Sequence, residues 1–204
     1  MVEGIEGSGK STLIAALAAR LGERGYSIVA TREPGGTTLG NRLRKVFVDP
    51  ATTIDPLAEA FVVNASRAQH VAEIIEPALR SGRWVLCDRF TAATLAYQGF
   101  GRGVDLDTLR TLAAIATHGR EPDLTLLVDL SVELSRERVQ TRARESGSAA
   151  DRLEREDAAF HARVREGYLQ LSREDARFSV LDGTLSPHGL VEAACAVVEA
   201  KFPS

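Results

Sequence analysis

The sequence predicts an α/β fold in which helices cover both faces of a parallel sheet. Short apolar runs alternate with segments of helical period along the 204 residues, as in strands joined by crossover helices. The stretch from Gly4 to Ser11 also has the spacing GxxxxGK[ST], which is typical of a phosphate-binding loop between a strand and a helix. Together these observations indicate the three-layer fold of the P-loop NTPases.

The first strand is expected to be short. Only Met1, Val2 and Glu3 precede Gly4, whereas strands usually have about five residues, so we expect the chain to begin inside this strand. The other strands are expected where apolar, partly β-branched runs end in a polar or Gly/Pro turn, at 27–31, 84–87, 124–130 and 178–181.

Helices are expected between these strands. The segment 11–25, STLIAALAARLGERG, reads as an amphipathic helix directly after the loop. Three later helices are expected to start at capping residues: Asp55 before Pro56, Ser131, and Ser186 before Pro187. The apolar stripe from 57 to 79 packs on the core by default, and its alternative role is a dimer face.

Composition limits the classes of function. The length suits a single domain, 1–204, and a net charge of −3 argues against non-specific binding of nucleic acid. Two cysteines favour a reducing compartment, and the sequence has neither room for a signal peptide before Gly4 nor an apolar run that could span a membrane. We therefore expect a cytoplasmic protein. The segment 145–151, ESGSAAD, is expected to be a mobile loop tip rather than a linker.

The P-loop is the strongest local signal. Its glycines let backbone N–H groups point at a β-phosphate, Lys10 reaches the β and γ oxygens, and Ser11 is a candidate Mg²⁺ ligand. Lys10 is one of only three lysines in the chain, so general abundance does not explain its position. The residues expected to bind ATP are Gly4, Ile5, Glu6, Gly7, Ser8, Gly9, Lys10, Ser11 and Thr12.

A second signal is WVLCDRF, residues 84–90. Asp88 at the end of an apolar run is a candidate Mg²⁺ ligand, and Arg89 beside it is suited to hold phosphate oxygens. A structural ion pair is the alternative for these two residues, and Asp129 is the competing carboxylate, although it is more easily read as part of a helix entry. A guanine-reading [NT]KxD motif is absent from the sequence, which argues against a signalling GTPase.

At this point the sequence resembles the bacterial thymidylate kinases, within the nucleoside monophosphate kinase group. Eight segments occur in the family's order: EGIEGSGKST, TREPGGT, SRAQHV, CDRF, AYQGFGRG, PDLTLLVD, DRLE and FHARVREGYL. The resemblance implies a five-stranded parallel sheet, a homodimer, and Mg²⁺-dependent phosphoryl transfer from ATP to dTMP. The acceptor is already an anionic phosphate, so such a reaction requires positioning and charge neutralisation rather than a general base.

The resemblance also implies an acceptor site. Glu6 corresponds to the acidic residue that meets the sugar 3′-hydroxyl, and Arg67 to the arginine that reaches the thymine carbonyl. Other matched positions line the base, the sugar and the phosphate end: Arg32, Glu33, Pro34, Arg89, Thr94, Tyr97 and Gln98. The chain departs from the family at Val63, where Phe commonly stacks on the base, and at Ala93, where Ser is common. Phe90 is one candidate to compensate for Val63.

Arginines near the loop tip are expected to supply charge at the transferred phosphate. In this family that charge comes from the P-loop or from a lid, and the P-loop position is Gly7 here. We therefore expect a lid at about 142–152, with Arg142 and Arg144 as catalytic residues and with Asp151 and Arg152 holding it in place. A solvated arginine-rich helix end is the alternative. Kinases for dUMP or dCMP, and a regulatory P-loop NTPase, remain the alternative functions.

Overall fold

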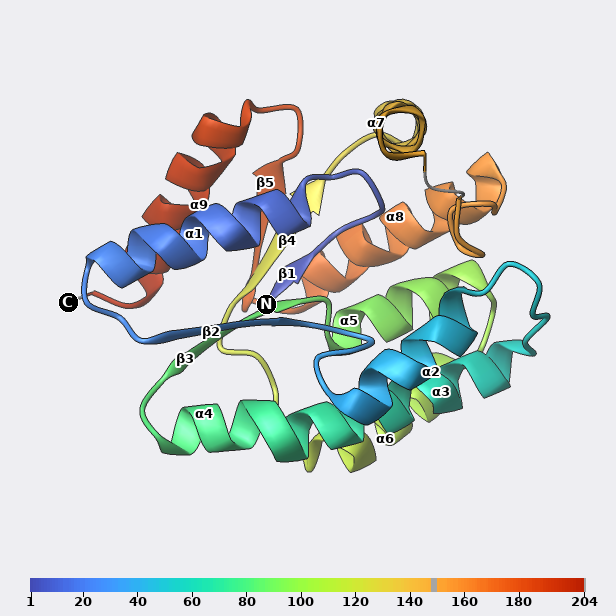
Figure 1. Ribbon diagram of the computed structural model, residues 1–204, viewed down its shortest axis with the longest axis horizontal. Helices are drawn as coiled ribbons and strands as arrows, with labels where there is room; N and C mark the ends of the chain where they lie inside the picture. The colour runs from blue at the N-terminus through green and yellow to red at the C-terminus, as the bar shows by residue number, and fades with distance from the viewer. Residues whose placement is uncertain (148–149, 204) are drawn as a thin grey trace.

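A five-stranded parallel sheet forms the centre of the computed structural model, which describes residues 1–147 and 150–203. Within these residues the strand order is β2-β3-β1-β4-β5, as Figure 1 shows. The α/β class and the five parallel strands are confirmed. The strands are β1 (Val2–Glu3), β2 (Ile28–Arg32), β3 (Trp84–Asp88), β4 (Thr125–Asp129) and β5 (Phe178–Asp182).

Helices connect the strands and cover both faces of the sheet. Their bounds are α1 (Lys10–Glu23), α2 (Thr38–Val48), α3 (Pro56–His70), η1 (Val71–Ile75), α4 (Glu76–Arg80), α5 (Thr91–Thr94), η2 (Leu95–Gly101), α6 (Leu106–Thr117), α7 (Val132–Ser146), α8 (Ala158–Glu174) and α9 (Pro187–Lys201). The segments η1 and η2 are π-helical. The predicted stripe from 57 to 79 is one continuous helical stretch, α3 to η1 to α4.

The predicted helix starts are confirmed by their caps. The side chain of Asp55 accepts a hydrogen bond from the Leu57 amide, Ser131 from Leu134, and Ser186 from Gly189. Each cap satisfies one of the amides that the first turn of a helix leaves unpaired.

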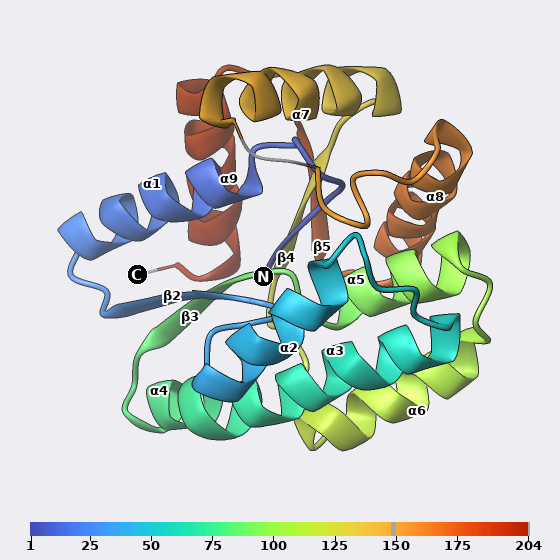
Figure 2. The same ribbon diagram turned by 45° about the vertical axis from the view of Figure 1, so that its right-hand side comes forward.

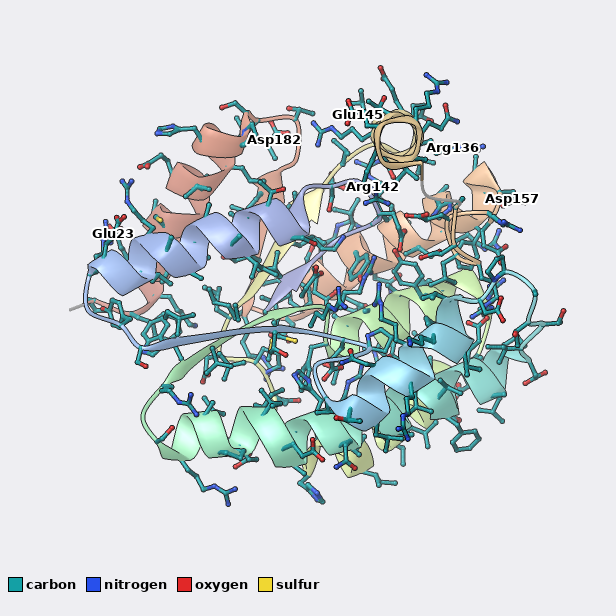
Figure 3. All side chains as sticks on the ribbon, viewed as in Figure 1. Glu23, Arg136, Arg142, Glu145, Asp157 and Asp182 are labelled. Carbon is teal, nitrogen blue, oxygen red and sulfur yellow. The ribbon has the colours of Figure 1, made fainter. Side chains whose placement is uncertain are left out.

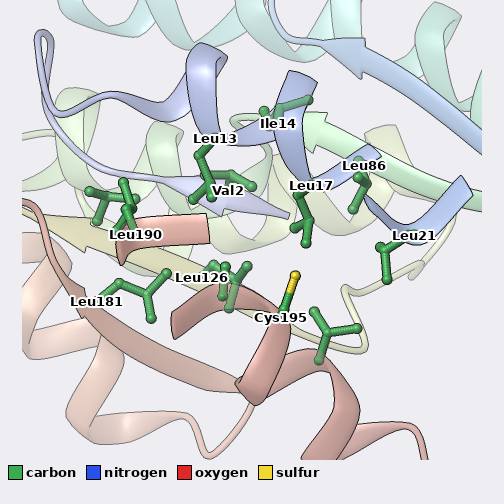
Figure 4. Close-up of a cluster of buried hydrophobic side chains, with 13 residues drawn as sticks. Val2, Leu13, Ile14, Leu17, Leu21, Leu86, Leu126, Leu181, Leu190 and Cys195 are labelled. Carbon is green, nitrogen blue, oxygen red and sulfur yellow. The ribbon is translucent and has the colours of Figure 1, made fainter. Parts of the chain in front are cut away.

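Alternate residues of the strands face different helices. Leu126 and Val128 of β4 pack with α1 and α9, whereas Leu127 between them belongs to the cluster that involves α8. Figure 4 shows the first cluster, in which Leu13 and Leu17 of α1 lie against Val2 at the centre of the sheet. Burial of each such side chain contributes about 1.5–3 kcal/mol.

The register of β1 fixes the position of the loop that follows it. Val2 lies opposite Asp88, the last residue of β3, and opposite Leu126 of β4, so the chain leaves β1 beside the carboxyl end of β3 while β4 continues to Asp129. Gly4 makes this exit possible, because its φ is +141° and a Cβ there would lie 2.5 Å from the Val128 carbonyl oxygen. Ligands bind beyond the carboxyl ends of such sheets, where the strand order reverses.

The first strand has two residues, as the sequence led us to expect of a short strand, while the other strands have five each. A cavity of 430 Å³ lies near its amino end, lined in part by Met1, Trp84, Leu124 and Phe202. The Met1 ammonium group donates to the Leu124 carbonyl oxygen (2.6 Å), and burial lowers its pKa.

The predicted lid is partly helical. Residues 142–146 form the last turn of α7, so Glu145 is helical rather than part of a loop, and the helix ends at Gly147 with φ +65°. Residues 148 and 149 of the predicted lid lie outside the described residues. Figure 2 shows α7 crossing above the carboxyl ends of the strands. In the described part of the chain, no helix is long and apolar enough to cross a membrane.

Candidate active site

A cavity of 470 Å³ opens at the carboxyl ends of the strands and joins the P-loop to α2, α3, η2 and α7. Most of the residues predicted to form the site line it. They are Glu6, Gly7, Gly9, Lys10, Ser11, Thr12, Arg32, Glu33, Pro34, Val63, Arg67, Asp88, Arg89, Thr94, Tyr97, Gln98 and Arg142. The predicted residues outside this lining are Gly4, Ile5, Ser8 and Arg144.

Lys10 is buried in the P-loop. Its Nζ donates to the Ile5 carbonyl oxygen (2.7 Å), and the Ser8 hydroxyl lies 3.4 Å away. Burial, and then the neighbouring charge of Arg89, lowers the pKa of Lys10 from 10.5 to about 8. A cation held in such surroundings is stabilised by a bound anion, so the P-loop is prepared for phosphate.

Ser11 and Asp88 form a pair of oxygen ligands. The Ser11 hydroxyl donates to Oδ2 of Asp88 (2.8 Å), and Oδ1 of Asp88 is buried without a hydrogen-bond partner among the described residues. A hydroxyl beside an unsatisfied carboxylate oxygen fits the hard oxygen donors that Mg²⁺ prefers. Asp129 lies outside the cavity lining, and both of its oxygens accept hydrogen bonds from Arg165, at 2.7 and 2.8 Å.

Arg89 has an unusual backbone and a fixed side chain. Its φ is +69°, a left-handed conformation that is rare for a residue with a side chain. Its Nη2 donates to Glu6 Oε1 (2.7 Å) and to the Tyr97 hydroxyl (3.1 Å), and its Nη1 donates to the Tyr168 hydroxyl (3.2 Å). Burial would raise the pKa of Glu6, but the charges of Arg89 and Lys10 outweigh it and lower that pKa. Glu6 therefore stays ionised.

Glu3 supports Arg89 indirectly, through the Tyr168 hydroxyl. Its carboxylate is fully buried and accepts hydrogen bonds from the Phe90 amide (2.7 Å) and from the Tyr168 hydroxyl (2.8 Å). Burial raises the pKa of Glu3, and Arg89 and Tyr168 lower it less than burial raises it. The Tyr168 hydroxyl therefore links Glu3 of β1 to the Arg89 guanidinium, so that β1 and α8 together hold this guanidinium in place.

Arg67 on α3 is held by four contacts. It donates to Glu33 (2.7 Å), Asn64 (2.9 Å), the Phe90 carbonyl oxygen (2.9 Å) and the Thr94 hydroxyl (3.1 Å). By this count four of its five N–H groups are used within the described residues, which leaves one on Nη1. Its fixed plane suits recognition of a carbonyl oxygen in the cavity.

Glu33 also binds His70 and lies near Cys87. His70 Nδ1 is 2.8 Å from Glu33, and its Nε2 is 2.7 Å from the Thr31 hydroxyl. The ligand atoms of Glu33, His70 and Cys87 lie within 4.8 Å of one another. Since both ring nitrogens and both carboxylate oxygens already have protein partners, we interpret the cluster as support for Arg67.

The apolar wall of the cavity contains Phe47, Val63, Ala93 and Leu153. Phe90 is not among the lining residues, because it packs with Val71 and Ile75 on the other side of Arg67. The expectation that Phe90 compensates for Val63 is therefore wrong. The sequence did not single out Phe47, nor Arg44, which lies three positions away on the same helix face and also lines the cavity.

Two arginines of α7 line the cavity, Arg138 and Arg142. They are four residues apart and so share a helix face, which is the sequence signal that predicts Arg138 once Arg142 is known. Arg138 Nη1 lies 3.5 Å from the Gly7 carbonyl oxygen, and Arg142 pairs with Glu154. Figure 3 shows Arg142 on the side of α7 that faces the P-loop. Arg144 is exposed and outside the lining.

Arg152 joins the segment after α7 to the wall of the cavity. It donates to the Phe47 carbonyl oxygen (2.9 Å) and pairs with the fully buried Glu59 of α3. Glu59 also accepts from Gln98 (3.0 Å) and pairs with Arg102 (3.2 Å). No local pattern predicts the role of Glu59, because its partners are distant in the chain.

His161 of α8 is a further residue that the sequence did not single out for the site. It is buried, and its Nδ1 lies 3.8 Å from Glu6 Oε2 and has no hydrogen-bond partner in residues 1–147 and 150–203. His161 lies next to the P-loop because α8 packs there. The spacing of the four histidines along the sequence does not predict this packing.

Comparison with known proteins gives a consistent family. The family model for "Thymidylate kinase" matches residues 2–194. The thymidylate kinase of Desulfovibrio desulfuricans is 50% identical over 97% of this chain and 93% of its own length, and that of Deinococcus radiodurans is 50% identical over 90% and 87%. The crystal structure of thymidylate kinase from Ehrlichia chaffeensis matches with a TM-score of 0.76 and 31% identity, over 97% of this chain and 95% of that chain.

The pKa of Lys10 predicts a pH dependence of stability. The unfolded chain holds this proton up to about pH 10.5 and the folded protein only to about pH 8, so unfolding binds a proton between these values and the folded state gains stability as the pH rises. Relative to Lys10→Met, the native protein should gain about 2–3 kcal/mol between pH 7 and pH 10. Urea unfolding of both proteins at each pH measures this. An equal difference at the two pH values would contradict a lowered pKa.

Proposed function

This chain belongs to the thymidylate kinase family, whose members phosphorylate dTMP, and we propose that it transfers the γ-phosphoryl group of ATP to dTMP within the 470 Å³ cavity. One observation carries the proposal: the same cavity is lined by the P-loop and, beyond Arg89, by a pocket with an apolar wall and a fixed arginine. A phosphate donor and a nucleotide acceptor therefore fit end to end.

The donor phosphates lie in the P-loop. Backbone amides at the start of α1 and the ammonium group of Lys10 bind the β and γ oxygens, and the helix N-terminus favours the negative charge. Ser11 and Asp88 would hold Mg²⁺, and a bound Mg²⁺ would neutralise charge on the donor phosphates. The orphaned Oδ1 of Asp88 supports this role.

The acceptor phosphate meets a group of arginines. Arg32, Arg44 and Arg89 all line the cavity, and burial together with the charges of Arg32 and Arg89 lowers the pKa of Arg44. Such mutual repulsion is relieved when a dianion binds among them. Glu6, held ionised by Arg89, is placed to accept a hydrogen bond from the sugar 3′-hydroxyl, and Tyr97 crowds a 2′-hydroxyl.

The base occupies the pocket between α2, α3 and η2. Arg67 has one N–H left for a base carbonyl, and Thr94, Gln98 and Val63 complete the walls. Arg67 cannot turn away easily, because Glu33, Asn64 and Thr94 hold it. Recognition of the base therefore uses a preformed donor, which reduces the entropy lost on binding.

Chemistry requires little more than alignment and charge. The attacking oxygen of dTMP is already anionic, so no residue has to remove a proton. As charge spreads over the transferred group, Lys10, Arg89, Arg138 and Arg142 stabilise it from three sides. Asp151 and Arg152 fix the segment after α7 by contacts to Glu154 and Glu59.

The same proposal includes a homodimer in the cytoplasm. Leu57, Phe61 and Ile115 are 41%, 54% and 68% exposed on the adjacent helices α3 and α6, which is more apolar exposure than isolated surface residues explain. Both cysteines are free, in keeping with a reducing compartment.

The substrate is tested by release of ADP with each nucleoside monophosphate. We expect dTMP to exceed dUMP by about tenfold in kcat/KM, because a buried methyl group contributes about 1–2 kcal/mol. Lys10→Ala, folded by circular dichroism, is the control for contaminating kinases and should lose turnover. More efficient use of dCMP or AMP than of dTMP would refute the acceptor assignment.

The arginines of α7 are tested by steady-state kinetics. Arg138→Ala and Arg142→Ala should each lower kcat about a hundredfold and leave the KM for dTMP within a few fold, because they act on charge that develops in the transition state. Arg136→Ala on the same helix is the matched control. Arg144→Ala tests the prediction from the sequence that Arg144 is catalytic, which a near-native kcat would contradict. If Arg138→Ala and Arg142→Ala also keep a near-native kcat, α7 covers the cavity without stabilising the transition state.

The dimer face is tested by sedimentation velocity. Phe61→Glu places a charge in the proposed interface and should shift the protein from dimer to monomer, whereas Val180→Glu on β5, which is similarly exposed at 51%, should not. A native protein that is monomeric at micromolar concentration would exclude this interface.

A further inference from the structure

We infer that Phe47 supplies the aromatic surface on which the acceptor base lies, and that Glu59 positions this ring through Arg152. The inference rests on the proposed function, since it concerns the base of the nucleotide in that same pocket. It assigns a binding role to a residue of α2 and a positioning role to a buried carboxylate of α3.

The choice of ring follows from the cavity itself. Among the described residues that line it, the aromatic ones are Phe47 and Tyr97. The hydroxyl of Tyr97 donates to Glu6 (2.6 Å) and accepts from Arg89 (3.1 Å). Tyr97 is therefore committed to the phosphate and sugar end of the cavity, and Phe47 is the ring that remains for a base.

Phe47 lies where a base bound by Arg67 would be. It belongs to the same buried cluster as Val63, which is one helical turn from Arg67 on α3, and α2 packs closely along α3. Val63 is too small to offer a flat surface, so Phe47 provides the planar contact that stacking requires.

The ring is fixed by its neighbours. The guanidinium of Arg152 lies over it, 5.1 Å from the centroid, and Arg152 also binds the carboxyl end of α2 through the carbonyl oxygens of Phe47 (2.9 Å) and Val48 (3.0 Å). Arg152 and the apolar neighbours of the cluster leave Phe47 only 4% exposed, and the part that is not covered lines the cavity. A ring held in this way loses little freedom when a base binds.

Glu59 connects this ring to the edge of the base. Its Oε1 pairs with Arg152, and its Oε2 accepts from Gln98 (3.0 Å), which also lines the cavity. The buried carboxylate of Glu59 therefore orients both Arg152, which lies over the Phe47 ring, and the side-chain amide of Gln98, which lines the base pocket. Loss of its charge would loosen Arg152, because the guanidinium would be left buried without a counter-charge.

The experiment measures dTMP binding and turnover in Phe47→Leu, Phe47→Ala, Val63→Phe and the double variant Phe47→Ala with Val63→Phe. Loss of a stacked ring typically weakens binding about tenfold to a hundredfold, so Phe47→Ala should raise the Kd and KM for dTMP by this factor, with kcat and the KM for ATP within threefold. Phe47→Leu should lie between, and the double variant should recover at least threefold relative to Phe47→Ala. Phe202→Ala, at the far end of the sheet against Trp84, is the matched control.

Glu59→Gln tests the positioning role. It should raise the KM for dTMP in the native background and add less than twofold in the Phe47→Ala background, because the two residues act through one contact. Equal effects in both backgrounds would remove Glu59 from the inference. Thermal unfolding of every variant identifies those that fail to fold, and Phe47→Leu keeps the test valid if Phe47→Ala does not fold.

The outcomes separate this inference from the proposed function. A native protein that does not phosphorylate dTMP refutes the function. A native protein that does so, together with a folded Phe47→Leu and Phe47→Ala that keep the native Kd for dTMP, overturns the inference alone.

Discussion

The guanidinium of Arg89 is the interaction on which the rest of the site depends. Its partners come from three separate parts of the chain: Glu6 from the P-loop, Tyr97 from η2 and Tyr168 from α8. In this largely buried setting these charge-assisted hydrogen bonds are strong, and removal of the cation would leave Glu6 without the counter-charge that binds it directly, with the charge of Lys10 still nearby. Arg89 thus sets the distance between the loop that binds one substrate and the pocket that receives the other.

The sheet explains why these partners meet. Parallel pairing places the ends of β1 and β3 side by side, and the left-handed backbone of Arg89 then turns its side chain toward the loop after β1. Glu3, buried beneath this turn, binds the Phe90 amide and the Tyr168 hydroxyl. The strained residue is therefore held by hydrogen bonds from both sides, as is common where backbone strain serves a binding site.

Local sequence carried the prediction of the fold and of the phosphate end of the site. Strand runs, capping residues and the P-loop spacing each depend on neighbours in the chain. Ser11 in the first turn of α1 and Asp88 at the end of β3 lie together because the P-loop and β3 meet at the same edge of the sheet. The base end could not be predicted in the same way. Phe90, the residue expected to compensate for Val63, packs with Val71 and Ile75, while Phe47 reaches the cavity from another helix. Glu59 and His161 depend on packing between α3, η2 and α8, for which a single sequence offers no spacing to read.

The central place of β1 has a consequence for the synthesis of the protein. β1 is synthesised before both of its partners: it is paired on one side with β3 and on the other with β4, whose residue Leu126 lies opposite Val2 and follows it by roughly 120 residues. At typical rates of translation, about 5–20 residues per second, roughly 6–25 s pass between the synthesis of β1 and the synthesis of β4, the later of its two partner strands. During that time Val2 and the apolar face of α1 lack the strands against which they pack in the finished fold, so the nascent chain is most exposed to wrong association before β4 is made.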